Sequence, residues 1–343
     1  MKLSKIVKSF IALTFCLPGA SNVLVAQVGG LDGFSFLQTP TTARISALSG
    51  VNITSQDEDV NMFLSNPALL VPDLHQHASI NYLNFLGDIQ YSSLAYAHNF
   101  EEVGLWSMGL QYFSYGAFEG YDEAGNEAVD FNARDFAVTI GYSRKVGVFT
   151  LGANLKFAQS NIASYTASAI MFDLGGTYKH PEREFTVGLA IKNFGFLVKD
   201  YTEEAETTLP FDLQVGTTFK PEHMPFRFSI TAYNLTRGNI AYYDPILSNN
   251  QEEPGTVDKI LRHVTIGTEI LVSKNFNIRA GYNHLIRKEL RLEETSGGAG
   301  FSMGFMIRIK AFELAYARRF YHVAGGSNTF TLASDLGEFI KKK

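Results

Sequence analysis

The chain has 343 residues, a formal net charge of −5, a single cysteine, and an aromatic content of 13% that comes mainly from 28 Phe and 16 Tyr. The acidic balance argues against nucleic-acid binding through a net basic surface. With only Cys16, the chain cannot form a disulfide framework.

The first 26 residues have the pattern of a secretory signal peptide. Lys2, Lys5 and Lys8 precede an apolar run at 10–17, and small residues end at Ala26. The apolar run is far shorter than the roughly 20 residues that a spanning helix needs. We therefore expect cleavage near Ala26 and a mature chain that begins at Gln27, lacks cysteine and carries a charge of about −8, since the three lysines leave with the leader.

Residues 27–76 predict neither a long helix nor a regular strand. The stretch 34–50, FSFLQTPTTARISALSG, is rich in Thr, Ser, Gly and Pro. The acidic run that follows, SQDEDVN at 55–61, could bind Ca²⁺ through Asp57, Glu58 and Asp59, of which Asp57 and Asp59 are the metal-ligand candidates. A solvated loop is the favoured interpretation, so we predict no metal site.

From residue 77 onward the hydrophobic pattern has a period of two, which is typical of β-strands. In 147–160, for example, Phe149, Leu151 and Leu155 alternate with polar or small residues such as Thr150 and Asn154. We predict fourteen antiparallel strands, at 78–86, 89–99, 104–115, 131–144, 147–160, 168–179, 184–195, 210–219, 225–235, 260–272, 275–287, 299–309, 311–322 and 328–334.

The gaps between these strands differ in length according to parity. Gaps after even-numbered strands are short, whereas those after most odd-numbered strands are long, at 116–130, 161–167, 196–209, 236–259 and 288–298. Outer-membrane barrels have short periplasmic turns and long outward loops. The pattern therefore favours a transmembrane β-barrel at 77–335 with a periplasmic tail at 336–343. We expect aromatic girdle residues at Tyr112, Phe113, Tyr115, Phe118, Phe320 and Tyr321.

Motifs for catalysis or cofactor binding are missing from the sequence. It contains no Walker loop, HExxH, CxxC or GxSxG pattern. A hydrolase built on the barrel wall needs only a Ser, a His and an acidic residue that meet in space, and no spacing selects such a set. We predict no catalytic residue and no cofactor.

The start of the mature chain resembles a known family. VGGLDGFSFLQTPTTARISALSGVNIT followed by DEDVNMFLSNPALL is similar to the start of the type IX secretion outer-membrane proteins, the PorV and PorQ branch of the FadL-like barrels. The similarity rests on the aromatic and aliphatic cluster at 34–37, Pro40, Ala43–Arg44, and Asn66–Pro67–Ala68. GGLDGFSFL makes the chain closer to PorQ. The resemblance implies a fourteen-stranded barrel whose N-terminal segment folds into the lumen.

Residues of the N-terminal segment are the candidates for a plug. A wide barrel must be filled or it leaks, and a polar segment suits a polar wall. We expect the guanidinium of Arg44 to pair with carboxylates on the wall. The predicted plug residues are Phe34, Phe36, Leu37, Pro40, Arg44, Asn66 and Pro67.

The resemblance implies a non-enzymatic part of the type IX secretion system in the outer membrane of a Gram-negative bacterium. Such a barrel, surrounded by outer-membrane lipid, would anchor a surface attachment complex with PorZ-like, PorU-like and PorV-like partners. The loop at 236–259 is the candidate docking site, with Tyr242, Tyr243, Pro245 and Ile246 as interface residues. The alternative is a FadL-like channel for hydrophobic small molecules.

Overall fold

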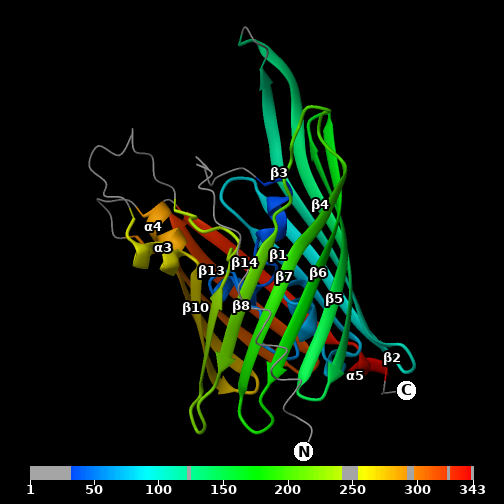
Figure 1. The fold of residues 1–343 in the computed structure, drawn as a ribbon, viewed down its shortest axis with the longest axis vertical. Coiled ribbons are helices and arrows are strands. Elements are labelled where there is room, and N and C mark those ends of the chain that lie inside the picture. Colours follow the sequence, from blue (N-terminus) through cyan, green and yellow to red (C-terminus); the bar gives the residue numbers. More distant parts are fainter. Residues whose placement is uncertain (1–31, 122–124, 242–253, 292–296, 323–324, 341–343) are drawn as a thin grey trace, which may run out of the picture.

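In the computed structural model, the residues described are 32–121, 125–241, 254–291, 297–322 and 325–340. Fourteen strands close into one antiparallel barrel, in which each strand pairs with its neighbours in sequence and β1 pairs with β14 (Figure 1). The strands are β1 His77–Asn84, β2 Gln90–Phe100, β3 Gly104–Tyr121, β4 Glu127–Val146, β5 Phe149–Ile162, β6 Tyr165–Lys179, β7 Phe185–Lys199, β8 Asp212–Phe219, β9 Phe226–Ala232, β10 Val264–Ser273, β11 Phe276–Asn283, β12 Phe301–Ile309, β13 Phe312–His322 and β14 Gly325–Asp335. The predicted fold class is confirmed.

The helical elements are short and lie before, between and after the strands. They are η1 Ser35–Gln38, α2 Ala43–Ala47, η2 Val60–Leu64, η3 Pro67–Leu69, η4 Pro72–Leu74, α3 Thr256–Arg262, α4 His284–Leu290 and α5 Gly337–Ile340. No helix in the described ranges is both long enough and apolar enough to cross a membrane.

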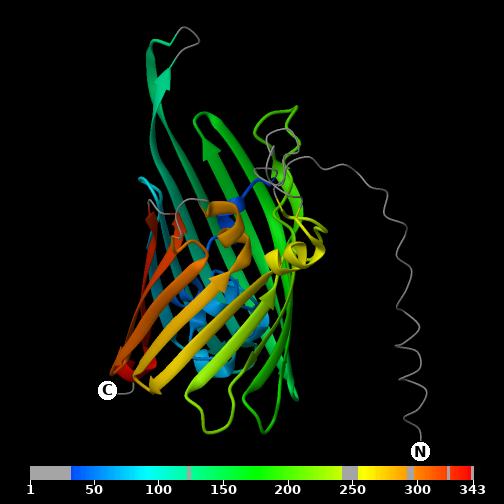
Figure 2. The same ribbon diagram turned by 90° about the vertical axis from the view of Figure 1, so that its left-hand side faces the viewer.

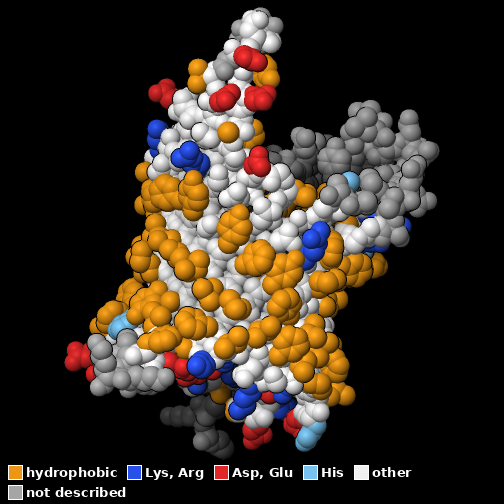
Figure 3. All heavy atoms as spheres, turned by 180° about the vertical axis from the view of Figure 1, so that it is seen from behind, with side chains coloured by type: hydrophobic (Ala, Val, Ile, Leu, Met, Phe, Trp, Pro, Cys, Tyr) orange, Lys and Arg blue, Asp and Glu red, His pale blue; other side chains and the backbone are white. Residues whose placement is uncertain are grey.

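The two faces of the wall follow the sequence alternation. In β5, the outward Phe149 and Leu151 are 53% and 57% exposed, whereas the inward Asn154 and Lys156 are 2% exposed. Apolar side chains cover the outer wall between charged groups at the two ends of the barrel (Figure 3). This arrangement is typical of a wall that faces lipid outside and a polar interior inside.

Two predicted girdle residues are placed wrongly by the sequence pattern. Phe113 is 7% exposed and faces the interior, where its ring lies 5.9 Å from that of Tyr91. The hydroxyl of Tyr115 donates to Asp135, whose side chain is also buried. Since neighbours on a strand face opposite sides, Tyr112 and Phe113 cannot both belong to an outer girdle, and it is Tyr112 that is exposed.

Several long-loop predictions are also corrected. The region 116–130 is mostly strand, because β3 and β4 continue past the rim as a hairpin (Figures 1 and 2). The predicted loop at 161–167 is a two-residue turn, since β5 ends at Ile162 and β6 begins at Tyr165. The predicted strand ends at 260–263 and 284–287 fall mainly in α3 and α4, and the predicted tail at 336–343 begins with α5.

Candidate functional site

Residues 32–76, the luminal segment, run through the barrel from the long-loop end to the short-turn end. At the long-loop end, Asp32 forms a parallel bridge with Thr208 in the β7–β8 loop and an ion pair with Arg237. At the other end, η4 leads directly into β1. The segment therefore lies inside the wall along the length of the barrel (Figure 2).

The first predicted plug residues pack against the wall. Phe34, Phe36 and Leu37 are 2–6% exposed and share a hydrophobic cluster with the inward rings of Tyr91 and Phe113. Each aromatic side chain of this size removes a large apolar area from water. The cluster thus holds the start of the luminal segment against β2 and β3.

Pro40 lies beside a small internal cavity. The cavity has a volume of about 250 Å³ and is also lined by Lys192 and Gln214 of the wall. Pro40 therefore contributes to the lining rather than to the apolar cluster.

Arg44 lies in a buried ionic cluster that joins the luminal segment to three strands. Its guanidinium is 2.5 Å from the carboxylate of Asp57 and 2.9 Å from that of Glu269 in β10. Arg227 of β9 contacts the same two carboxylates at 2.6 and 3.1 Å, and Arg279 of β11 is 3.0 Å from Glu269. Charge-assisted bonds of this kind fix both position and orientation.

The Asn66–Pro67 pair lies against glycines on β5 and β6. The side chain of Asn66 accepts from the amide of Ala68 and donates to the carbonyl of Ile53, so it caps η3. A Cβ atom at Gly175 would overlap Asn66, and one at Gly152 would overlap the backbone of Pro67. Glycine at these two inward positions therefore lets the luminal segment approach the wall closely.

Hydroxyl groups connect the other side of the luminal segment to β12 and β14. The amide of Ala43 donates to Thr331 at 2.9 Å, and the hydroxyls of Ser46 and Thr329 are 2.8 Å apart. Ser302 donates to the carbonyl of Ala47 at 2.7 Å. The luminal segment is thus bonded to opposite sides of the barrel.

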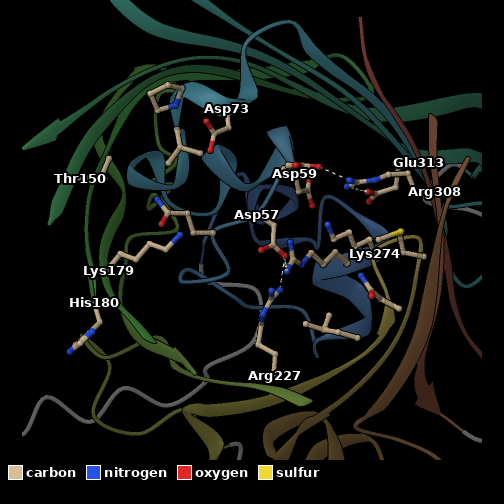
Figure 4. Close-up of a pocket in the computed structure, with 18 of the residues that line it drawn as sticks. Asp57, Asp59, Asp73, Thr150, Lys179, His180, Arg227, Lys274, Arg308 and Glu313 are labelled. Atoms are coloured by element: carbon tan, nitrogen blue, oxygen red, sulfur yellow. Dashed lines mark hydrogen bonds and ion pairs between the residues drawn. The ribbon is translucent and has the colours of Figure 1, made fainter. Parts of the chain in front are cut away.

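A large polar cavity lies at the short-turn end, below the ionic cluster. It has a volume of about 1100 Å³, and its lining carries both charge signs, including Lys145, Lys179, Lys274 and Asp73 (Figure 4). In Figure 4, Asp57 and Arg227 point toward each other while Lys179 and His180 lie across the cavity. Its mixed charge selects no particular ligand.

The two carboxylates considered as metal ligands have other partners. Asp57 pairs with Arg44 and Arg227, and Asp59 accepts from the amide and side chain of Asn61. Within the part of the chain that the structure describes, no three His, Cys, Asp or Glu residues form a group that could hold a metal ion. Asp57 and Asp59 therefore belong to the internal contacts of the luminal segment.

A cleft with an aromatic lining opens at the long-loop end. It has a volume of about 620 Å³ and lies between the start of the luminal segment, β3, β4, β5 and the β7–β8 loop. The rings of Phe34, Tyr115, Phe118, Phe131 and Tyr201 line it together with Ala133, Asp135, Ser160 and Ile162. We call it the outer cleft. Its size is that of pockets which bind small organic molecules.

The sequence pattern did not predict that these residues come together in the outer cleft. Asp135 lies on the inward face of β4 between the small residues Ala133 and Ala137. A carboxylate at an inward position of the strand alternation was the feature of the sequence that could have indicated this site. Tyr115 was assigned to a lipid girdle and Tyr201 to a loop. The proposed docking residues Tyr242, Tyr243, Pro245 and Ile246 lie outside the described residues.

No family model matches the chain, and no curated protein sequence matches it. Similar solved structures include a mutant of TodX, a monoaromatic hydrocarbon channel, with 14% identity, a TM-score of 0.48, and coverage of 87% of this chain and 97% of that one. They also include the Ralstonia pickettii toluene transporter TbuX, with 13% identity, a TM-score of 0.49, and coverage of 89% and 97%. A Pseudomonas aeruginosa FadL homologue has 12% identity, a TM-score of 0.46, and coverage of 85% and 97%. These three structures are FadL-family outer-membrane barrels, and they give no support to the PorV and PorQ part of the resemblance.

Proposed function

We propose that this chain is a barrel of the Gram-negative outer membrane that binds a small hydrophobic molecule at its outward mouth, as the first step of uptake. The observation that carries the proposal is the outer cleft, where five aromatic rings surround a volume of about 620 Å³. Ligand sites of this kind are concave and mostly apolar, with few polar groups. The proposal involves binding and passage and no chemical reaction.

The membrane location is supported by the outer wall. Large apolar side chains on strands all round the barrel are exposed, and Leu94, Met108, Ile230 and Leu314, for example, are 41–49% exposed. In water such a surface would be an aggregation hazard, whereas lipid covers it at no cost. The short-turn end then faces the periplasm and the β3–β4 hairpin faces outward.

The luminal segment limits how a molecule crosses. Its contacts with the apolar cluster, the ionic cluster and the hydroxyls of β12 and β14 hold it to the wall along the barrel. A molecule bound in the outer cleft contacts the start of this segment, because 32–35 form part of the cleft lining. Passage beyond the cleft therefore requires a shift of the luminal segment.

Binding of a neutral fluorescent hydrophobe, N-phenyl-1-naphthylamine, to the barrel in lipid nanodiscs tests the proposal. We expect saturable binding that is lost in Ala133→Trp, which fills the cleft. Lys179→Trp is the matched control, since it places the same side chain in the cavity at the opposite end. Unchanged saturable binding in Ala133→Trp, or no saturable binding in the parent barrel, would overturn the proposal.

Anchoring of a type IX surface complex is the second candidate function. It is favoured by the fixed luminal segment and by the β3–β4 hairpin, which extends beyond the other strands as a surface for a partner (Figure 2). The proposed partners are the PorZ-like, PorU-like and PorV-like proteins. Cross-linking in cells followed by purification of the barrel tests this function. Recovery of these partners with the parent barrel, and its loss when 117–130 is shortened to a tight turn, would support anchoring. Absence of the partners from the purified parent barrel would contradict it.

A further inference from the structure

The outer cleft has an unusual charge composition. Its lining contains three carboxylates, those of Asp32, Asp135 and Glu206, and among the described residues that line it none is Lys, Arg or His. Asp32 is neutralised by Arg237, and Glu206 is exposed at the rim. Asp135 is therefore the group that decides what the interior of the cleft binds.

Asp135 is buried without a cationic partner. Its side chain is 3% exposed, and none of the ion pairs found among the described residues includes it. Tyr115 donates to one carboxylate oxygen at 2.7 Å, and the adjacent Ser160 accepts from the hydroxyl of Tyr201 at 2.6 Å. Two other buried acids of the wall differ, since Asp173 has Lys156 at 2.7 Å and Glu269 has three arginines. Asp212 of β8 is also buried and belongs to none of those ion pairs, but both of its carboxylate oxygens accept hydrogen bonds, from Gln214 and from the amide of Asn234.

A carboxylate buried in this way is favourable only when something compensates its charge. The hydroxyl of Tyr115 supplies part of the compensation, and the other carboxylate oxygen of Asp135 has no hydrogen-bond partner among the described residues. A buried ion is costly unless it is also paired with an opposite charge. The rings of Tyr115, Phe118, Phe131 and Tyr201 also line the cleft, and the face of an aromatic ring attracts cations. The rings of Phe118 and Phe131 are stacked at 5.2 Å, so they form one continuous apolar wall.

The hairpin above the cleft has the same charge sign. In the described parts of 116–132, the charged residues are Glu119, Glu127 and Asp130, and none is Lys or Arg. A single-sign cluster beside a concave site raises the local concentration of oppositely charged ligands. The negative charges of the hairpin outside the cleft and the carboxylate of Asp135 inside it therefore both favour cations.

We propose that the outer cleft selects hydrophobic organic cations, that is, amines with an apolar or aromatic group. The ammonium binds Asp135, and the apolar part lies against the rings of Phe34, Phe118 and Phe131. This inference rests on the proposed function, because it names the ligand class of the same cleft. Neutral hydrocarbons fit the rings but leave Asp135 unpaired, and carboxylates are repelled by it.

Three probes with the same apolar part test the inference: 4-phenylbutylamine, 4-phenylbutanol and 5-phenylpentanoate. Their binding to the barrel in nanodiscs is measured by displacement of the neutral naphthylamine probe at neutral pH. We expect the ammonium to bind about tenfold or more tightly than the alcohol, as a desolvated ion pair with cation–π contacts predicts. The carboxylate is expected to bind most weakly.

Asp135→Asn keeps the shape of the side chain and removes its charge. We expect it to weaken the ammonium about tenfold while the affinity of the alcohol changes less than about threefold. Glu102→Gln, an exposed change in the β2–β3 turn at the opposite end, removes the same charge and is expected to leave all three affinities unchanged. Phe131→Leu preserves an apolar wall and is expected to weaken the ammonium more than the alcohol.

The outcomes separate the two proposals. If the alcohol or the carboxylate binds as tightly as the ammonium, or if Asp135→Asn affects all three probes equally, the cation inference is wrong while a hydrophobic cleft stands. If none of the probes displaces the naphthylamine, the cation inference also fails, whereas the proposed function itself fails only if the parent barrel does not bind the naphthylamine saturably or if Ala133→Trp binds it unchanged. A heat-dependent shift in gel mobility shows that each variant is a folded barrel, and Phe131→Leu provides the comparison should Asp135→Asn not fold.

Discussion

The guanidinium of Arg44 and the carboxylate of Glu269 lie 2.9 Å apart inside the barrel, although 225 positions separate them in the chain. This contact joins the luminal segment to β10, and Asp57, Arg227 and Arg279 complete the cluster around it. Arg44 and Glu269 are nearly fully buried, so removal of one of them takes charge-assisted hydrogen bonds from the other members where water cannot replace them fully. Substitutions in this cluster therefore test whether the luminal segment is held against the wall.

Arg44→Met is expected to loosen the luminal segment and leave the wall intact. The change leaves Asp57 with one arginine instead of two. Asp57 keeps Arg227, and Glu269 keeps Arg227 and Arg279, so what is lost is the hydrogen bonding of Arg44 to charged groups, about 1.5–3 kcal/mol. Hydrogen exchange should therefore accelerate in 34–76 while the strands remain protected.

Arg308→Met is the control for this prediction. Arg308 also bridges two carboxylates, Glu58 and Glu313, but its side chain is 33% exposed. Exposed pairs contribute only about 0–1 kcal/mol. Equal effects of the two variants on exchange in 34–76 would contradict the role assigned to the ionic cluster.

Gly175→Ala is expected to displace the Asn66–Pro67 turn from the wall. A Cβ atom there would overlap the side-chain oxygen of Asn66, so the turn or β6 must shift. Overpacking of this kind costs about 1–3 kcal/mol. The neighbouring Gly176→Ala faces the other side, where its nearest atom is Leu151 Cδ2 at 3.5 Å, and is expected to be neutral. Unfolding in urea compares the two, and equal midpoints would show that the close approach does not exist.

The contact between α3 and α4 is expected to survive mild acid and fail in strong acid. Burial raises the pKa of Asp258, but hydrogen bonds from Arg262 and His284 and the charges of Arg262 and Lys288 lower it to about 2, below the ordinary value of 3.8. Because the pKa is depressed in the fold, the stabilisation is complete above the ordinary value and is lost as the pH falls toward about 2.

Limited digestion with pepsin measures this pH dependence. We expect 256–262 and 284–290 to resist cleavage at about pH 4 and to be cut at about pH 2, because Asp258 is protonated only at the lower pH. The variant Asp258→Asn is expected to be cut at both pH values. The control variant Asp73→Asn, at the short-turn end of the barrel, is expected to be cut in the same way as the parent protein. Resistance of Asp258→Asn at about pH 4 would contradict the assignment.

The strands could be predicted from sequence because each wall residue faces either lipid or lumen. The alternation in β5 and β12 is a local property, so the sequence shows it directly. The two short helices also left a signal that was missed: Val257, Ile260 and Leu261 have helical spacing, and Asn283 caps α4 by accepting from Ile286. Instead, the predicted strands were extended over the end of α3, at 260–262, and over the start of α4, at 284–287.

The contacts that fill the lumen could not be predicted in detail. Arg44 was expected to meet carboxylates of the wall, but nothing local to Glu269 shows that it lies opposite Arg44. The outer cleft also brings together residues from β3, β4, β5 and the β7–β8 loop, whose proximity depends on closure of the barrel and on the continuation of the β3–β4 hairpin. Such relationships are properties of the folded chain.

Cross-linking of the luminal segment to β14 tests the central claim most directly. The hydroxyls of Ser46 and Thr329 are 2.8 Å apart, and the only native cysteine, Cys16, lies in the predicted leader. In the double variant Ser46→Cys with Thr329→Cys, we predict that oxidation of the folded barrel in membranes joins the two thiols almost completely, so that maleimide labels neither. Free, fully labelled thiols in that folded barrel would show that the N-terminal segment does not lie inside the wall.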